Sequence, residues 1–368
     1  MRLLVITQKI DLDDAVLGFT HGWLDEFARQ AESIVAICLE KGRVNLPKNV
    51  TVLSLGKEKE KNHESRITNQ GVIKKIKYSW HLLRYIVTFR NEYDSVFVHM
   101  NPEYVVLGGI FWKWWGKTVT LWYAHKSITW YLRLAHLLTN IIFTSTASGF
   151  RLPSVKVKVI GQGIDVSKFQ ITNHKSQKKI DVFRIVTVGR ITPAKDYDTL
   201  IEAIEIVGKN SDLKIHMDIF GPTAGASDEA YLNRLKEKVA QKALAGVIAF
   251  RGPVANNELP EVLAGYDLFV NMGQTGSLDK AVPEAMAVGL PVLTCNEAFK
   301  EVLGPFRGDL MYGKGDSKLL AGKIKKITEL SADDRRMLGE ELRAIVVRDH
   351  SLRSFVSKIL FAIKFSKS

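Results

Sequence analysis

Short apolar runs alternate along the first half of the chain with segments whose apolar positions recur at helical spacing. The helical spacing is clearest over residues 20–30 and 72–88. Continuous apolar runs separated by amphipathic helices are typical of a parallel sheet covered by helices. We therefore predict a doubly wound α/β domain. Its expected strands are residues 3–7, 33–39, 49–55, 95–100, 118–124, 141–146 and 157–161.

The same alternation restarts after a polar, basic stretch, ITNHKSQKKI, which has no apolar period. A chain of 368 residues exceeds the size at which one hydrophobic core keeps growing. We predict two similar α/β domains, residues 1–169 and 182–349, joined by a linker at residues 170–181. Doubly wound sheets bind ligands at the carboxyl ends of their strands, so we expect a site in a cleft between the domains.

The final segment is predicted to form a separate element, residues 350–368. It reads SLRSFVSKILFAIKF and has the pattern of a basic amphipathic helix. It begins after the alternation of the second domain has ended.

The composition is that of a globular protein, with 46% hydrophobic and 25% charged residues. The net charge is +13, and residues 1–170 contribute +9 of it, from 23 Lys and Arg against 14 Asp and Glu. A basic partner surface is therefore expected mainly on the N-terminal domain. No nucleic-acid partner is predicted, because no recognisable module interleaves aromatic residues with the cations.

The apolar runs predict a cytoplasmic protein that does not span a membrane. The first run meets Gln8 and Lys9 before it could form a signal-peptide core. The most apolar region, residues 104–123, is interrupted by Lys113 and Lys117. The two cysteines lie far apart in apolar runs, which favours buried, reduced thiols.

Residues 71–90 are basic and contain no acidic residue. Cations among large apolar side chains are typical of a helix that lies on anionic lipid. An ordinary domain helix, with its apolar stripe in the core and its lysines in water, has the same composition. We favour peripheral binding at the inner face of the plasma membrane. The residues concerned are Lys74, Lys75, Lys77, Arg84 and Arg90 among Trp80, Leu82, Leu83 and Ile86.

The stretch GSLDKAVPEAMAVGLPVLT, residues 276–294, predicts a loop, a short helix that ends at Gly289 and a strand. Free N–H groups and the positive end of the dipole at the start of such a helix can hold a phosphate without a metal. The candidate phosphate loop is Ser277, Leu278, Asp279, Lys280 and Ala281, and Gly276 before it is a further candidate for donor binding.

Glu284 lies in the first turn of this predicted helix. The helix dipole favours a carboxylate there, so capping alone would explain it. Beside a phosphate loop we favour a second role, in which Glu284 accepts hydrogen bonds from ribose hydroxyls.

A second segment, VTVGRITPAKDYDTLIEA, predicts a strand that ends at Gly189 and a helix that begins near Tyr197. Arg190 and Lys195 project from the loop between them. Two cations on one such loop suit a diphosphate. Exposed cations near a helix start are also commonly just solvated.

Together these two segments resemble family 4 of the retaining glycosyltransferases, a large group with the GT-B fold. The family pattern is a VGR-x4-K loop followed by EAMA-x-G-x-P-V, and the match is close over residues 183–300. The segments VIGQGIDVSKF, HMDIFGP and VIAFRGP also fit, whereas the N-terminal domain matches less specifically. The resemblance implies two Rossmann-like domains facing across a cleft, with the C-terminal helix packing back across their junction.

The resemblance also implies roles for single residues. Arg190 and Lys195, beside Gly189, would hold the donor diphosphate. Glu284 would hold the ribose, and the backbone near Arg251 and Gly252 would hold the nucleobase. His125, in LWYAHKS, would lie beside the donor sugar.

The implied reaction moves a hexose-like sugar from a nucleoside diphosphate sugar to a glycan or to a polyprenyl or other lipid-linked acceptor. The configuration of the sugar is retained, through same-face attack assisted by the donor phosphate. Charge that develops on the leaving diphosphate would be stabilised by the two cations and the phosphate loop.

Two departures from the family pattern affect this interpretation. The family usually has another glutamate eight residues before Glu284, where this chain has Gly276, and Asp279 lies close enough to substitute for it. The first loop keeps only Gly18 of a paired-glycine pattern and offers His21 instead. Gly18 and His21 are the candidate residues on the acceptor side.

No metal cofactor is inferred, because the tight acidic group Asp11, Asp13 and Asp14 is expected to be a solvated loop. Gly276 leaves open a rival function, a catalytically silent GT-B protein that binds sugar nucleotides or glycans. A hydride-transferring Rossmann enzyme is disfavoured, since no G-x-G-x-x-G follows the first strand.

Overall fold

The computed structural model describes residues 1–14, 16–60, 70–169, 182–209, 214–273 and 277–366. It divides into two compact units, Met1–Gly163 with Leu352–Ser368, and Ile164–Ser351. The division falls before residue 169 because Ile164 and Phe169 are buried in the core of the second unit. The predicted linker, residues 170–181, lies outside the described residues.

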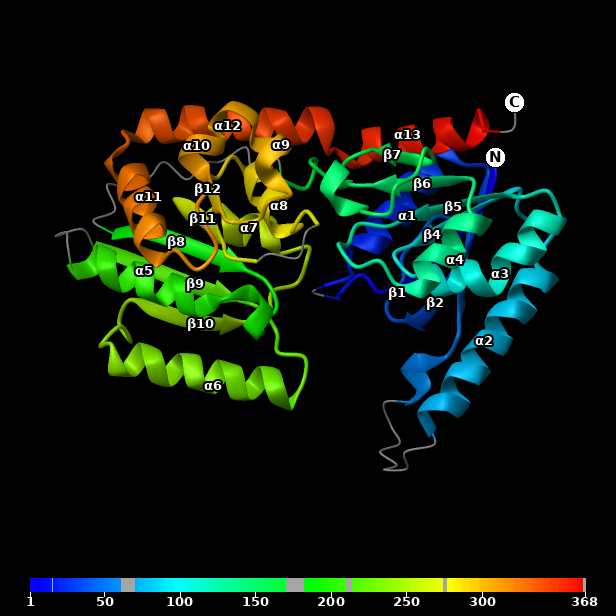
Figure 1. Ribbon diagram of the computed structural model, residues 1–368, viewed down its shortest axis with the longest axis horizontal. Helices are drawn as coiled ribbons and strands as arrows, with labels where there is room; N and C mark the ends of the chain where they lie inside the picture. The colour runs from blue at the N-terminus through cyan, green and yellow to red at the C-terminus, as the bar shows by residue number, and fades with distance from the viewer. Residues whose placement is uncertain (15, 61–69, 170–181, 210–213, 274–276, 367–368) are drawn as a thin grey trace. The chain divides into compact units, whose positions relative to one another are not determined.

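The N-terminal unit is built on one parallel sheet (Figure 1). The inner strands are buried on both faces, which explains their continuous apolar runs, whereas the two edge strands, residues 50–54 and 157–159, are only partly buried. The strand order reverses between β1 and β4, so the loops after these two strands diverge. Over the described residues the order is β3 (Val50–Ser54), β2 (Ser33–Lys41), β1 (Arg2–Ile10), β4 (Ser95–His99), β5 (Thr118–Trp122), β6 (Ile141–Thr144) and β7 (Val157–Val159).

Helices cover both faces of this sheet and bury separate apolar clusters. On one face, α1 (Phe19–Gln30) and α13 (Leu352–Lys364) pack on each other, with Phe27 and Phe355 fully buried. The other face is covered by α2 (Gln70–Thr88), α3 (Pro102–Trp114) and α4 (Trp130–Leu138). The C-terminal helix α13 is thus part of the N-terminal unit (Figure 1).

The chain leaves the N-terminal unit at Gly163, against α1 and α13. The carbonyl of Gly163 accepts a hydrogen bond of 2.9 Å from Trp23 Nε1. Its φ is +69°, and a Cβ there would lie 2.9 Å from the Phe355 ring. Both facts require glycine at this exit.

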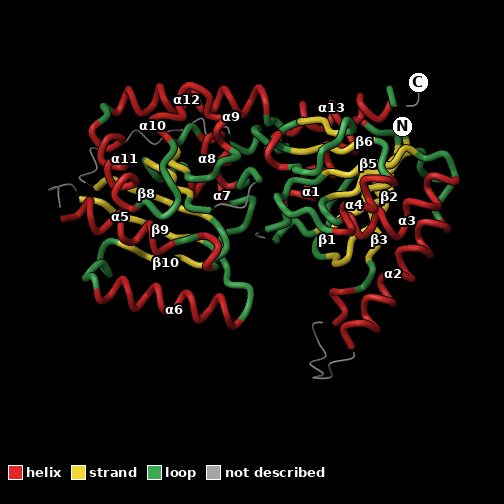
Figure 2. Tube along the Cα trace, viewed as in Figure 1, coloured by secondary structure: helices red, strands yellow, loops and turns green. Residues whose placement is uncertain are grey.

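The C-terminal unit has a smaller parallel sheet, visible as yellow strands in Figure 2. Its strand order reverses at β8, which lies between β9 and β11. In the part of the chain that the structure describes, the order is β10 (Ile248–Gly252), β9 (Lys214–Phe220), β8 (Val182–Val188), β11 (Leu268–Asn271) and β12 (Val292–Thr294).

Helices again cover this second sheet. The doubly wound α/β fold predicted for both domains is therefore confirmed. The helices of this unit are α5 (Tyr197–Lys209), α6 (Ala226–Gln241), α7 (Leu259–Leu263), α8 (Ala281–Val288), α9 (Phe299–Leu303), α10 (Arg307–Leu310), α11 (Ser317–Glu329) and α12 (Ala332–Asp349).

Three neighbouring strands of the second sheet end in glycines that pack backbone to backbone. Gly189 N–H donates to the carbonyl of Phe220, and Gly221 N–H donates to that of Gly252. A Cβ on Gly221 would lie 1.8 Å from the Gly189 carbonyl oxygen, so only glycine fits there. This contact determines where the loop after β8 leaves the sheet.

Both cysteines are buried and free, as the sequence predicts. Burial raises the pKa of the Cys38 thiol to about 12 and that of Cys295 to about 11. Protonated, buried thiols are unreactive. Among the described residues, no helix combines the length and apolar character needed to cross a membrane.

Candidate functional site

The loop after β8 folds back over the end of its strand. A 3₁₀ turn at Pro193–Lys195 and a left-handed residue, Asp196 with φ +49°, lead into α5. The turn brings the Lys195 ammonium back to Gly189. Arg190 is exposed. Both cations therefore belong to the loop at the point where the strand order reverses.

The loop after β11 meets this turn. Asp279 forms an ion pair with Lys195 through its Oδ2 atom. The two side chains are only 13% and 17% exposed, respectively. Asn271, the last residue of β11, donates a hydrogen bond of 2.8 Å to the same oxygen. Lys195, Asp279 and Asn271 thus form a polar cluster at the carboxyl ends of β8 and β11.

Further side chains hold Asn271 in place. Thr294 Oγ1 donates to Asn271 Oδ1 over 2.9 Å, and Tyr312 OH donates to the Asn271 carbonyl over 2.9 Å. Asn296 Nδ2 donates to the Ser277 carbonyl over 2.8 Å and so ties down the phosphate loop. The sequence interpretation missed these supports. A polar residue at the end of an apolar strand, as in LFVN, was the available signal.

The carboxylate of Asp279 does not cap α8. Lys280 occupies the N-cap position without a side-chain hydrogen bond to the helix. A lysine has three N–H donors, so Lys195 can contact an anion while it remains paired with Asp279. Asp279 thereby reduces the positive charge of the cluster without removing its donors.

The predicted short helix is α8, and Gly289 ends it with φ +84°. The helix begins two residues before Pro283, which is tolerated in a first turn because its missing N–H has no partner there. Every residue of α8 is buried. Glu284 is 5% exposed, so its carboxylate is largely shielded from water.

Burial raises the pKa of Glu284 to about 7, although the charge of Lys280 and a hydrogen bond from Asn256 oppose the change. Burial lowers the pKa of Lys280 to about 7, and Glu284 opposes that change. Burial therefore favours the uncharged form of both groups. Such a carboxyl group can accept a hydrogen bond from a sugar hydroxyl when ionised or donate one to it when protonated.

Arg251 and Gly252 lie away from this cluster, on β10, which β9 separates from β8. Arg251 Nε is 2.5 Å from Asp218 Oδ1, a carboxylate that is 1% exposed. Tyr266 OH donates to the other oxygen of Asp218 over 2.8 Å. The Arg251 side chain thus stabilises a buried charge. Gly276 lies outside the described residues.

The N-terminal unit contains its own pocket, of about 360 Å³. It lies at the carboxyl ends of β1, β4 and β5, next to the reversal of strand order. Ligands bind at this position in doubly wound sheets. The polar residues that line it include Gln8, His99, Asn101, Glu103, Tyr123 and His125.

His125 is the predicted catalytic residue in this pocket. Its Nδ1 accepts a hydrogen bond of 3.1 Å from the Ser127 N–H, which assigns the proton of the neutral ring to Nε2. Burial and the nearby Lys126 charge lower the His125 pKa. His125 is therefore a neutral donor that can bind a sugar oxygen.

The residues predicted on the acceptor side lie elsewhere in the unit. Gly18 is the N-cap of α1. His21 is 6% exposed, and its Nε2 accepts a hydrogen bond of 3.0 Å from Asn45 N–H. Neither is among the described residues that line the pocket.

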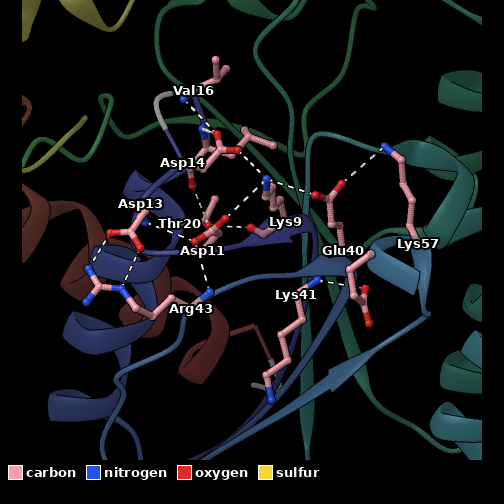
Figure 3. A network of polar contacts seen from close by, with 12 residues as sticks. Lys9, Asp11, Asp13, Asp14, Val16, Thr20, Glu40, Lys41, Arg43 and Lys57 are labelled. Carbon is pink, nitrogen blue, oxygen red and sulfur yellow. Dashed lines mark hydrogen bonds and ion pairs between the residues drawn. The ribbon is translucent and has the colours of Figure 1, made fainter. Parts of the chain in front are cut away.

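The first loop carries a network of charges, shown in Figure 3. Lys9 Nζ lies 2.6 Å from Asp14, 3.1 Å from Glu40 and 3.4 Å from Asp11. Burial opposes the charge of Lys9, but its bonds to Asp14 and Glu40 raise its pKa. The prediction of a solvated loop is wrong for Asp11 and Asp14, which are 17% and 19% exposed, because Lys9 draws both inward.

Asp13 lies at the outer edge of the same loop, where Arg43 clamps its two oxygens at 2.5 and 2.6 Å. Across the described ranges, no group of three or more His, Cys, Asp or Glu side chains is placed to hold a metal ion.

The two Rossmann-like units define a GT-B fold. HepE from Anabaena, solved in complex with UDP and glucose, superposes with a TM-score of 0.75, covering 99% of this chain and 100% of that one at 16% identity. Sucrose-phosphate synthase from Thermosynechococcus elongatus superposes with a TM-score of 0.77, covering all of both chains at 14% identity. At these identities the similarity establishes the fold.

The sequence of the second unit also matches a known family. Residues 168–344 match the family model described as "Glycosyl transferases group 1". The matched segment contains the Lys195 and Asp279 cluster, Glu284 and Arg251.

Curated relatives match over parts of their length. Mannosylfructose-phosphate synthase of Agrobacterium fabrum is 30% identical over 110 residues, which are 30% of this chain and 24% of that protein. The putative colanic acid biosynthesis glycosyltransferase WcaL of Escherichia coli is 24% identical over 204 residues, 54% of this chain and 48% of that protein. The chain thus spans less than half of the length of these relatives.

Proposed function

We propose that this protein is a retaining glycosyltransferase of family 4, which moves a hexose-like sugar from a nucleoside diphosphate sugar to a glycan or lipid-linked acceptor. The observation that carries the proposal is the Lys195, Asp279 and Asn271 cluster at the reversal point of the second sheet. It lies within the segment that matches the glycosyl transferases group 1 family.

The chemistry assigned to the cluster is electrostatic. Lys195 and Arg190 stabilise the charge that develops on the leaving diphosphate. Asp279 contacts a hydroxyl of the donor sugar, and Glu284 contacts the ribose. The proposal assigns the neutralising charge to these side chains and includes no metal ion. Retention follows the same-face attack usual for the family, without a protein nucleophile.

Donor binding has support from a neighbour of the same fold, since HepE was solved with UDP and glucose. A uridine nucleotide is therefore the first donor to test. The rival function, a silent protein that binds sugar nucleotides without transfer, shares the binding step and differs only in turnover.

Sugar nucleotides are expected to raise the melting temperature of the protein, because a ligand that binds only the native state stabilises it. The screen should include UDP-glucose and the corresponding ADP, GDP and TDP sugars. Glu284→Gln keeps the size of the buried side chain and removes its charge. It should weaken binding of the stabilising nucleotide by about tenfold.

The matched control for this screen is Glu301→Gln, an exposed glutamate of the same unit. Binding is compared through the rise in melting temperature that each ligand causes in each variant. A change in the melting temperature of the ligand-free variant therefore does not affect the comparison. If no nucleotide raises the melting temperature, donor binding itself is contradicted. If the Glu284→Gln and Glu301→Gln variants bind the nucleotide alike, Glu284 has no role in donor binding.

The proposed place of action is an anionic membrane surface, contacted through α2. Leu82 and Ile86 are fully buried in the core, as for an ordinary domain helix. The first half of α2 differs, because Ile73 and Ile76 are each 64% exposed and Trp80 is 56% exposed. Figure 1 shows this half extending beyond α3 and α4. Exposed apolar side chains beside lysines suit an interfacial helix.

Neighbouring helices of the same layer add to this surface. On α3, Ile110 and Trp114 are 68% and 80% exposed. On α4, Trp130 and Leu137 are 59% and 63% exposed. Tryptophans are enriched at membrane interfaces, where their rings lie among the headgroups.

Vesicles that contain anionic lipid are expected to bind the protein, and salt should weaken the binding. Replacing Lys74, Lys75 and Lys77 together by Glu should weaken it at least about 100-fold, since each cation near such a surface contributes about 1 kcal/mol. Co-sedimentation with vesicles measures the bound fraction.

The control replaces three exposed lysines of the other unit, Lys314, Lys318 and Lys326, by Glu, which changes the net charge equally. Loss of binding in this control, or equal binding to neutral vesicles at high salt, would contradict a specific contact through α2.

A further inference from the structure

The pocket of the N-terminal unit has an unusual charge balance. No lysine or arginine is among the described residues that line it, whereas one carboxylate, Glu103, is. Lys126 follows His125 in the chain but does not line the pocket. A site that holds a phosphate normally presents cations or several free N–H groups to it.

The nearest cation on β1 is already neutralised. Lys9 follows the lining residue Gln8, but its ammonium is held by Asp11, Asp14 and Glu40 (Figure 3). Its side chain is 16% exposed, so it is fixed within the network. Lys9 therefore adds little positive potential to the pocket.

Glu103 has acceptor capacity that the protein does not use. It lies in the first turn of α3, next to Pro102. Among the described residues, its Oε2 is buried and has no hydrogen-bond partner. A buried polar atom without a partner costs about 1–3 kcal/mol, and a ligand hydroxyl recovers this cost once the carboxylate turns that oxygen toward the pocket. The charge of Glu103 also helps burial to raise the pKa of Tyr123, another lining residue.

The backbone at the pocket is held in a rare conformation. Met100, between His99 and Asn101, has φ +63°, in the left-handed region that non-glycine residues seldom adopt. Its N–H is bonded to the Trp122 carbonyl over 2.7 Å. Such a strained turn, held by the neighbouring strand, positions Asn101 and the start of α3.

We propose that this pocket binds an uncharged, polyhydroxylated ligand, a sugar without a phosphate, and that Glu103 selects for it. The carboxylate accepts hydrogen bonds from sugar hydroxyls and repels a phosphate. His125 donates to a sugar oxygen through Nε2, and Asn101 offers an amide. We identify this ligand as the acceptor sugar, and this identification rests on the proposed function. Several relatives, such as mannosylfructose-phosphate synthase and D-inositol 3-phosphate glycosyltransferase, have phosphorylated compounds in their names.

Saturation-transfer NMR on the full chain tests the proposal. The probes are glucose, galactose, mannose and N-acetylglucosamine, each paired with its 6-phosphate. At least one neutral sugar is expected to bind about tenfold more tightly than its phosphate. Glu103→Gln keeps the shape of the side chain and removes its charge, so the ratio should fall toward one.

The control variant is Glu92→Gln, an exposed glutamate of the same unit, which should keep the wild-type ratio. Phosphates that bind as tightly as the neutral sugars would overturn the proposal. So would a ratio that Glu103→Gln leaves unchanged, or a panel in which no neutral sugar binds. Stabilisation by sugar nucleotides, measured on the same samples, reports separately on the proposed function.

Discussion

Replacing Lys195 by Ala is expected to lower transfer from a sugar nucleotide by roughly 30-fold, and Arg190→Ala should have a similar effect. In the proposed mechanism each change removes a charge-assisted contact to the leaving diphosphate, at a cost of about 2 kcal/mol in transition-state stabilisation. Steady-state rates at low donor concentration measure this cost. The loss should appear in kcat/KM, since the charge on the diphosphate grows in the transition state.

The matched control is Lys209→Ala, at the other end of α5. Lys209 is 72% exposed and bonded to Glu205, so its removal should leave the rate unchanged. Wild-type turnover in both the Lys195 and Arg190 variants would contradict the assignment of the loop after β8. Loss of activity in Lys209→Ala as well would indicate a general effect on folding.

The second large effect is expected for Asp279→Ala, which should lower transfer at least tenfold while free nucleoside diphosphate binds as well as before. The proposed partner of Asp279 is the donor sugar, which the free nucleotide lacks. The variant also releases Lys195 from its ion pair, so binding of the diphosphate should not weaken. Calorimetric titration with UDP and a transfer assay separate the two effects.

Asp279→Asn distinguishes contact with the sugar from simple positioning of Lys195. Asparagine can still accept the hydrogen bond from Asn271 but has no charge to pair with Lys195. A variant that is less stable but transfers sugar at the wild-type rate would refute the substitution of Asp279 for the glutamate absent at Gly276. Glu284→Gln should differ, because it weakens binding of the free nucleotide too.

The sequence predicts the sheets well because buried parallel strands need continuous apolar runs. It also places Arg190 and Lys195 correctly on the loop after β8, since strand ends and helix starts have local signals. It does not predict that Lys195 pairs with Asp279, 84 residues further along the chain. Such a contact depends on how two loops fold back over adjacent strands, which no local pattern encodes.

The ion pairs of the charged first loop could not be predicted from the sequence either. Asp11, Asp13 and Asp14 read as a solvated acidic group, yet Lys9 and Arg43 fix them (Figure 3). Lysine at the end of a strand is ordinary in sequence, and only the return of the loop makes it the centre of a network. The pocket around Glu103 was missed for a related reason, because its residues come from three strand ends.

The apolar side chains of α2 lie in two different environments, the protein core and the solvent. Leu82 and Ile86 follow the core spacing and are buried, whereas Ile73, Ile76 and Trp80 are exposed. Periodicity identifies the apolar positions but not where the sheet ends beneath the helix. The interpretation as an ordinary domain helix applies to the half that contains Leu82 and Ile86, whereas contact of the exposed half with anionic lipid stays a prediction.

The most direct test of the central claim is a transfer assay with the wild-type protein. The nucleotide that stabilises it most is supplied in labelled form with a membrane lipid and glycan extract, and products are separated by mass. A glycosylated product is expected with the wild-type protein, and its amount should fall roughly 30-fold with Lys195→Ala. A protein that binds the nucleotide yet transfers its sugar to nothing in the extract would not be a glycosyltransferase and would fit the silent relative instead.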